Sequence, residues 1–233
     1  MYLIIKRAID FIFSLVFLLL LAPVFLVLML LLSLTGEHKV FYLQERVGFK
    51  NKRFKIFKFA TMLANSPNLG TGDITIRNDP RLIPMGKFLR KTKLNELPQL
   101  LNVLIGDMTL VGPRPLMVKG FERYSPNIQA RIYNVKPGIT GIGSVIFRDE
   151  EAIVSKSLNY NESYNKINSF KGELELWYQK NISFFTDLSI LFLTGWVLLF
   201  PNTRLPNKFF PDLPTFDKQS ILKVSSSEQT ILI

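Results

Sequence analysis

The sequence contains no cysteine and only one histidine, His38, in 233 residues. The absence of cysteine excludes disulfide bonds, thiolate nucleophiles and cysteine-ligated metals, and it leaves the redox compartment undecided. A single histidine cannot form a histidine cluster, so a zinc site is not expected. No internal repeat is present either. The length therefore predicts one domain with additions rather than a repeat array.

Acidic residues are outnumbered, since 29 lysines and arginines against 18 aspartates and glutamates give a net charge of +11. Hydrophobic residues make up 48% of the chain and the mean hydropathy is +0.20, which indicates that part of it lies in lipid. A basic membrane protein is expected to lie against anionic lipid headgroups and to favour anionic substrates. Nucleic acid is the competing partner for such charge, but the sequence has no recognisable nucleic-acid module, so none is expected.

Charged residues are absent from residues 11–36, and nearly all of them to Leu34 are apolar. A straight helix of about 24 residues would be roughly 36 Å long, enough to span a bilayer. Pro23 lies near its middle and predicts a kink, because proline cannot donate to the carbonyl of Leu19. Basic residues flank both ends, namely Lys6 and Arg7 before, and Lys39, Arg46 and Lys50 after. The positive-inside rule then keeps both ends in the cytoplasm, as a re-entrant hairpin does; a kinked spanning helix is the alternative.

Residues 90–115 carry the most informative pattern in the chain. Four leucines at i, i+3, i+4 and i+7 predict one face of a helix: Leu97, Leu100, Leu101 and Leu104. Asn95 is the predicted N-cap, and Gly106 follows the last turn. Asn95 and Glu96 would then lie at a helix start, where free N–H groups attract phosphate. A carboxylate there, among the cations of Arg90 and Arg114, indicates phosphate chemistry. The alternative is a capped amphipathic helix with solvated charges.

Three motifs in this stretch are specific: residues 94–100 (LNELPQL), 106–109 (GDMT) and 111–115 (VGPRP). The pattern resembles the bacterial sugar transferases, the monotopic polyprenyl-phosphate phosphoglycosyl transferases. Further segments of the resemblance are residues 44–48, 57–62 and 131–141, and it covers about residues 6–199. Ala60 departs from the family, whose members usually carry a basic residue there.

Alternating patterns predict strands at residues 40–43 and 54–59 around a basic turn. Helical segments are expected at residues 81–94 and 116–124, and an interfacial or buried helix at residues 188–200. The resemblance implies a membrane-associated α+β fold with an N-terminal re-entrant hairpin kinked at Pro23. The expected organisation is an anchor at residues 1–36, a small cytoplasmic domain of mixed helices and a β-hairpin with interfacial helices at 37–200, and an irregular tail at 201–233.

The resemblance implies transfer of a sugar-1-phosphate from a UDP-sugar to polyprenyl (undecaprenyl) phosphate, with Mg²⁺, on the cytoplasmic face of the bacterial inner membrane. This would be the first membrane step in assembling a glycan such as exopolysaccharide, capsule or O-antigen. Phosphate or substrate contacts are expected from Lys58, Arg90, Arg114 and Arg148, and metal ligation from Glu96 and Asp107. For Arg148 the alternative is an ion pair with Asp149 or Glu151, and for Asp107 a bond to turn amides.

Asn95 stands where the family has its catalytic aspartate. A carboxamide is a very poor nucleophile, so several alternatives stay open. Glu96 is the nucleophile of a rearranged pair; Asn95 positions substrates that react directly; the chain is an inactivated form; or it is a silent member that binds nucleotide-sugar or lipid phosphate, or serves as a scaffold. Membrane lipids are expected partners in every case, and a homo-oligomer is compatible with the sequence.

Overall fold

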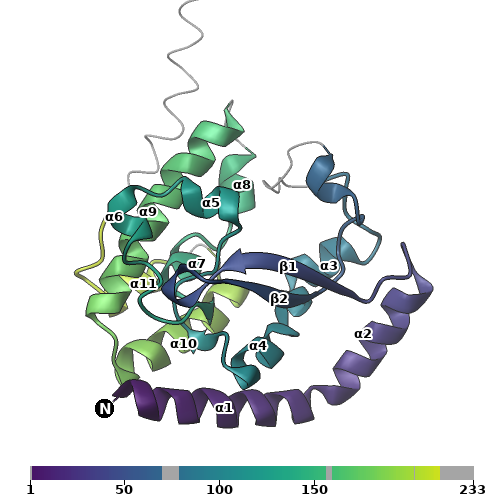
Figure 1. Ribbon diagram of the computed structural model, residues 1–233, viewed down its shortest axis with the longest axis horizontal. Coiled ribbons are helices and arrows are strands. Elements are labelled where there is room, and N and C mark those ends of the chain that lie inside the picture. Colours follow the sequence, from purple (N-terminus) through teal and green to yellow (C-terminus); the bar gives the residue numbers. More distant parts are fainter. Residues whose placement is uncertain (1, 70–78, 156–158, 202, 216–233) are drawn as a thin grey trace, which may run out of the picture.

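The computed structural model describes residues 2–69, 79–155, 159–201 and 203–215. It is a mixed α+β molecule whose helices surround two small two-stranded sheets (Figure 1). The strands are β1 (Phe41–Val47), β2 (Arg53–Phe59), β3 (Thr109–Val111) and β4 (Gly138–Thr140). The longer helices are α1 (Tyr2–Leu20), α2 (Ala22–Leu34), α9 (Tyr160–Lys180) and α10 (Phe184–Leu199). The shorter ones are η1 (Phe49–Asn51), η2 (Ser66–Asn68), α3 (Gly86–Lys91), η3 (Leu94–Glu96), α4 (Gln99–Ile105), α5 (Val118–Glu122), α6 (Pro126–Gln129), α7 (Ile142–Ile146), α8 (Glu150–Val154) and α11 (Leu205–Phe209).

The apolar N-terminal run forms two helices rather than one. Among the described helices none alone is long and apolar enough to cross a membrane, whereas α1 and α2 together fit a broken span or a re-entrant loop. The pair bends by 61° at the position predicted from Pro23, which lies in the first turn of α2. Proline is tolerated there because the first helical N–H groups lack intrahelical partners. The predicted kink is therefore confirmed.

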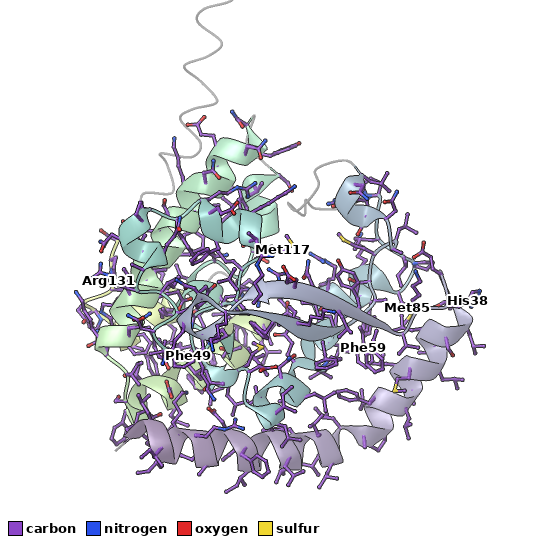
Figure 2. The ribbon with its side chains drawn as sticks, viewed as in Figure 1. His38, Phe49, Phe59, Met85, Met117 and Arg131 are labelled. Atoms are coloured by element: carbon purple, nitrogen blue, oxygen red, sulfur yellow. The ribbon has the colours of Figure 1, made fainter. Side chains whose placement is uncertain are left out.

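Both helices of the pair pack on the same domain. Leu28 and Leu32 of α2 are buried in a cluster with Phe59 of β2, and the rings of Phe25 and Phe59 lie 5.3 Å apart. Figure 2 shows Phe59 between the hairpin and α2. On the other side of the bend, α1 packs beneath α4 and β3 (Figure 1). The two outer parts of the helix pair are thus held to one domain, while the bend projects from it.

The polar residues at the start of α1 make buried contacts with the domain. The Lys6 ammonium lies 2.5 Å from the Asp187 carboxylate of α10 and is 8% exposed. Asp10 accepts bonds from the Thr109 hydroxyl at 2.5 Å and from the Leu110 N–H at 3.2 Å. We interpreted Lys6 from the sequence as a basic flank that fixes topology. In the structure the Lys6 charge is paired with Asp187, and the topology stays a prediction.

The predicted hairpin is confirmed and is longer than expected. β1 and β2 pair antiparallel from Phe41 opposite Phe59 to Val47 opposite Arg53. The second sheet joins β3 and β4 in parallel. Its close packing requires glycine, because a Cβ on Gly138 would lie 2.1 Å from the Gly112 nitrogen. This approach holds the segment after β3 against the start of β4.

The main core lies between α9, α10 and the second sheet. Its fully buried members include Leu174, Ile190 and Leu193. The opposite side of α10 exposes large apolar residues such as Phe185 and Leu199. The helix predicted over residues 188–200 is therefore present and one-sided, and it begins at Phe184. The tail predicted to be irregular contains α11, and residues 216–233 lie outside the described part.

Two other expected helices are shorter than predicted. The segment 81–94 is helical only in α3, and the segment 116–124 only in α5. Residues 79–85 are instead held by contacts across the fold: Met62 forms an isolated bridge with Leu82, and the Ile83 N–H donates to the Thr61 carbonyl. Periodicity cannot reveal such long-range backbone pairing.

Candidate active site

Glu96 and Arg114 form a bidentate ion pair that joins the segment before α4 to the turn after β3. The Arg114 Nη2 lies 2.5 Å from the Glu96 Oε1, and its Nη1 lies 3.1 Å from Oε2. Parallel contacts of this kind are the strongest arginine–carboxylate geometry. η3 carries Glu96, and the turn after β3 carries Arg114. The expected approach of Arg114 to the carboxylate is confirmed.

The electrostatic balance keeps Glu96 ionised. Burial by itself would raise the Glu96 pKa, but Arg114, Lys93 and Lys58 outweigh it and hold the pKa well below its ordinary value. The carboxylate in turn raises the pKa of Arg114. The Glu96 side chain is 11% exposed and that of Arg114 is 31% exposed. A desolvated anion is thus kept in place by its cationic neighbours.

Asn95 does not cap α4 as the sequence predicted. Lys93 adopts a left-handed conformation with φ 61°, and the chain then makes the 3₁₀ turn of η3 before α4 begins at Gln99. Pro98 takes the N-cap position without a side-chain bond. Asn95 is 4% exposed, and its Oδ1 is buried with no hydrogen-bond partner among the described residues. The C-terminal prediction holds, since Gly106 ends α4 with φ 97°.

Lys58 lies next to this pair, as the resemblance implied. The structure adds Gln44 and Arg46, which belong to a segment of the resemblance but had no predicted role at the site. Gln44 Oε1 accepts from the Arg46 Nη2 at 2.5 Å and from the Lys58 Nζ at 3.4 Å. Burial and then the charge of Arg46 lower the Lys58 pKa well below its ordinary value. Burial and the charge of Arg114 lower the Arg46 pKa to about 10. Alternation along β1 and β2 places Gln44, Arg46 and Lys58 on one face of the hairpin, and this pattern in the sequence could have identified them as neighbours.

Arg90 and Arg148 come from two further parts of the chain. Arg90 lies in the last turn of α3, and its charge lowers the Lys58 pKa. Arg148 follows α7 and donates to the Lys91 carbonyl at 3.1 Å, and its Nη1 lies 3.5 Å from the Asp149 carboxylate. The ion pair weighed as the alternative for Arg148 is therefore present. A phosphate contact of Arg148 stays a prediction.

Glu175 of α9 is a buried carboxylate beneath the Arg114 turn. It is 3% exposed, and its Oε1 accepts from the Gly143 N–H at 3.2 Å. A Cβ on Gly143 would lie 2.7 Å from that oxygen, so only glycine leaves room for it. Burial raises the Glu175 pKa to about 8, although Gly143, Lys171 and Arg114 favour the anion. Sequence analysis did not select it, because α9 is far from the motif in the chain.

The structure does not place Asp107 near Glu96. Glu96 precedes α4, whereas Asp107 follows its C-terminal glycine and is exposed at the other end. The seven residues of α4 separate them by about 10 Å. Within the described ranges, no cluster of three or more metal-ligating acidic or histidine side chains occurs.

The chain shares sequence with sugar transferases over most of its length. The profile of the family described as bacterial sugar transferase matches residues 1–201. A UDP-galactose-lipid carrier transferase of Erwinia amylovora is 34% identical over 208 residues, covering 83% of this chain and 40% of that protein. A UDP-glucose:undecaprenyl-phosphate glucose-1-phosphate transferase of Klebsiella pneumoniae is 36% identical over 192 residues, covering 81% of this chain and 39% of the relative.

A shorter relative is matched over more of its length. The uncharacterized sugar transferase EpsL of Bacillus subtilis is 43% identical over 155 residues, which cover 66% of this chain and 67% of that protein. The chain spans only about two fifths of the first relatives that it matches. The matched region contains both the helix pair and the Glu96–Arg114 site. The chain belongs to the bacterial sugar transferase family.

Proposed function

We propose that this protein transfers a sugar-1-phosphate from a UDP-sugar to undecaprenyl phosphate and so starts the assembly of a bacterial glycan. The observation that carries the proposal is the desolvated Glu96 carboxylate within a group of cations that includes Lys58, Arg90 and Arg114. A diphosphate donor and a phosphate acceptor both need such charge neutralisation. The names of the relatives supply the substrate classes.

Glu96 is the nucleophile in this proposal. One carboxylate oxygen attacks the phosphorus that bears the sugar, the bond to the bridging oxygen breaks, and UMP leaves. An oxygen of undecaprenyl phosphate then attacks the same phosphorus, which breaks the acyl-phosphate bond and restores the carboxylate. Arg114 occupies both carboxylate oxygens in the structure. Attack therefore requires Arg114 to exchange Glu96 for a substrate phosphate, which offers the same geometry.

The residues present fit a magnesium ion whose coordination is completed by substrate phosphates. Mg²⁺ prefers oxygen ligands and is commonly bound by one or two carboxylates together with phosphates. Glu96 and the unpartnered Oδ1 of Asn95 would hold it. When bound, the ion would neutralise charge on the diphosphate. Asn95 would then serve as a ligand and positioning group, and Lys58 and Arg114 would neutralise the remaining phosphate charge.

The helix pair is proposed to enter and leave the membrane by one face. Its two outer parts pack on the same domain, and the residues around the bend expose apolar side chains such as Leu19 and Leu20, each 68% exposed. A spanning helix would carry one of those parts to the opposite side. Because the basic residues Arg7, Lys39 and Lys50 flank the pair, the positive-inside rule would place the domain on the cytoplasmic face of the bacterial inner membrane.

Transfer is tested with purified protein in nanodiscs, Mg²⁺, undecaprenyl phosphate and a panel of UDP-sugars, with UMP release as the readout. We expect activity in the wild type, loss in Glu96→Gln, and retention in Glu45→Gln, which removes an exposed carboxylate (side chain 50% exposed). With labelled donor and no acceptor, the wild type should retain a phosphosugar on Glu96. A silent wild type together with an active Asn95→Asp would refute the proposal for this chain and favour the binding or scaffold role.

The membrane topology has its own test, because the sequence has no cysteine to interfere with labelling. Single cysteines at Leu3 and Lys39, one on each side of the bend, should both react with an impermeant reagent from the cytoplasmic side. Labelling of the two positions from opposite sides would establish a spanning pair instead.

A further inference from the structure

A crevice opens beside the hairpin where α2 leads into β1. Its walls are mainly apolar and come from β1, the end of β2 and the segment that follows α2. The lining residues are Glu37, Lys39, Phe41, Tyr42, Ala60, Met62, Ala64 and Ile83. The C-terminal part of α2 lies at one end, since Leu32 packs in the same cluster as Ile83. Figure 1 shows the start of β1 next to the end of α2.

One residue of the crevice shares a face of the hairpin with the cationic residues of the site. Tyr42 lines the crevice and lies directly opposite Lys58 in the hairpin. Tyr42, Gln44 and Arg46 alternate along β1 and therefore face the same side. At about 3.3 Å per residue, the four steps from Tyr42 to Arg46 cover about 13 Å. An apolar channel and a polar, cationic face thus follow one another along a single strand.

Neither Arg46 nor Lys58 forms a direct ion pair with a residue in the described part of the chain. Both donate to the neutral Gln44 Oε1, Arg46 also donates to the Pro115 carbonyl at 3.3 Å, and the Glu96 carboxylate that acts on both is bonded to Arg114. The Arg46 Nε is buried with no hydrogen-bond partner in the part of the chain that the structure describes. These are two partly buried cations, and one of them has an N–H group without a partner. Such a pair favours a phosphate ligand.

We propose that this channel holds the acceptor lipid, with the phosphate of a long-chain isoprenoid phosphate on Arg46 and Lys58 and its first isoprene units in the crevice. The inference rests on the proposed function and deepens it by assigning one of the two substrates to a place. A phosphate joined to an apolar chain matches both parts of the channel, whereas a hydrophilic nucleotide-sugar matches only one. The chain would reach lipid alongside α2, whose Leu30 and Leu34 are more than 60% exposed.

Ala60 controls the width of the crevice. It is 8% exposed and lines the wall next to Phe41 and Met62. A larger side chain there would occupy the space assigned to the isoprenoid, and it would leave the Glu96–Arg114 pair in place. Glu37, the carboxylate at the rim, accepts from the Ala64 N–H at 2.6 Å and is turned to the backbone.

The first test varies acceptor length in the wild type, in Ala60→Leu and in Ala130→Leu. Ala130 is an exposed alanine at the end of α6, remote from the crevice. We expect Ala60→Leu to raise the KM for undecaprenyl phosphate about tenfold, with little change for a two-isoprene phosphate or for the UDP-sugar. Ala130→Leu should match the wild type. An equal effect on both acceptors, or none, would overturn the assignment, and thermal unfolding would confirm that Ala60→Leu is folded.

The second test does not depend on turnover. A long-chain prenyl phosphate with a photoreactive group on its first isoprene unit should label the peptides around Phe41 and Met62. Excess inorganic phosphate and Arg46→Gln should each reduce the labelling severalfold. Labels confined to α1 or α10 would place the chain elsewhere. If this labelling succeeds in a protein that releases no UMP, the lipid site stands and the proposed transfer fails, so the two failures are distinguishable.

Discussion

The coupling of Glu96 to Arg114 gives the sharpest quantitative prediction. Replacing Arg114 by methionine leaves the Glu96 carboxylate buried without its main partner. Removing one member of a buried pair costs about 3–5 kcal/mol. Because the Arg114 side chain is 31% exposed, water can partly replace it, and we expect a loss of about 2–3 kcal/mol. For a chain of this size that corresponds to a fall in Tm of about 4–12 °C.

A double-mutant cycle isolates the interaction. Glu96→Gln should destabilise the protein less than Arg114→Met, since arginine can keep contact with water. The double variant should be more stable than Arg114→Met alone, because it no longer contains a lone buried carboxylate. The assay is unfolding of all four proteins in detergent, followed by circular dichroism at low and high salt. The buried pair should show a coupling of about 2 kcal/mol that salt changes little.

The exposed pair between Arg53 and Glu45 is the matched control. Its atoms lie 3.2 Å apart, but the side chains are 64% and 50% exposed. Such surface pairs contribute below about 1 kcal/mol and are screened by salt. If the Glu96–Arg114 cycle were additive within about 0.5 kcal/mol, or as salt-sensitive as this control, the description of Glu96 as a desolvated anion would be wrong.

Three further substitutions test the supports of the site. Wild-type stability should fall as pH rises from 4.5 to about 8, because Glu175 stays protonated to a higher pH in the folded protein than in the unfolded chain. Glu175→Gln should remove this pH dependence, which is worth at most about 5 kcal/mol. Urea titrations across that pH range measure it. Asp187→Asn should leave Lys6 buried without its counter-charge and speed hydrogen exchange in α1, whereas loss of stability without faster exchange there would refute the docking role. Asn102→Ala should cost about 2–4 kcal/mol in thermal unfolding, because the buried amide accepts from the Phe57 N–H and donates to the Lys55 carbonyl; a change below 1 kcal/mol would contradict this.

Local patterns in the sequence predicted the elements that depend on local physics. The hairpin was predicted because alternation and a turn define it, and the kink because Pro23 cannot complete the hydrogen bonds of a continuous helix. The left-handed C-cap at Gly106 follows from the same kind of reasoning. The approach of Arg114 to Glu96 was expected because both belong to one motif, and the structure confirms it.

Residues whose roles depend on distant partners were missed. Arg46, Gln44 and Glu175 come from β1 and α9, and only the tertiary fold brings them to the Arg114 turn. The error at Asn95 has a different cause. A residue of N-cap type before a leucine pattern predicts a helix start, but the left-handed Lys93 makes a 3₁₀ turn that delays α4 until Gln99.

Helix α4 connects α1 to the turn that carries Glu96. At its C-terminal end the Arg7 guanidinium of α1 donates to the carbonyls of Val103 and Leu104, which belong to the last turn of the helix. Its N-terminal end follows the turn that carries Glu96. α4 rises from α1 towards the hairpin (Figure 1), and its seven residues span about 10 Å. A short helix thus fixes the distance of the carboxylate from α1. A phosphate whose chain lies in lipid can be met only at a defined height, so this spacing favours a lipid-linked substrate over two soluble ones.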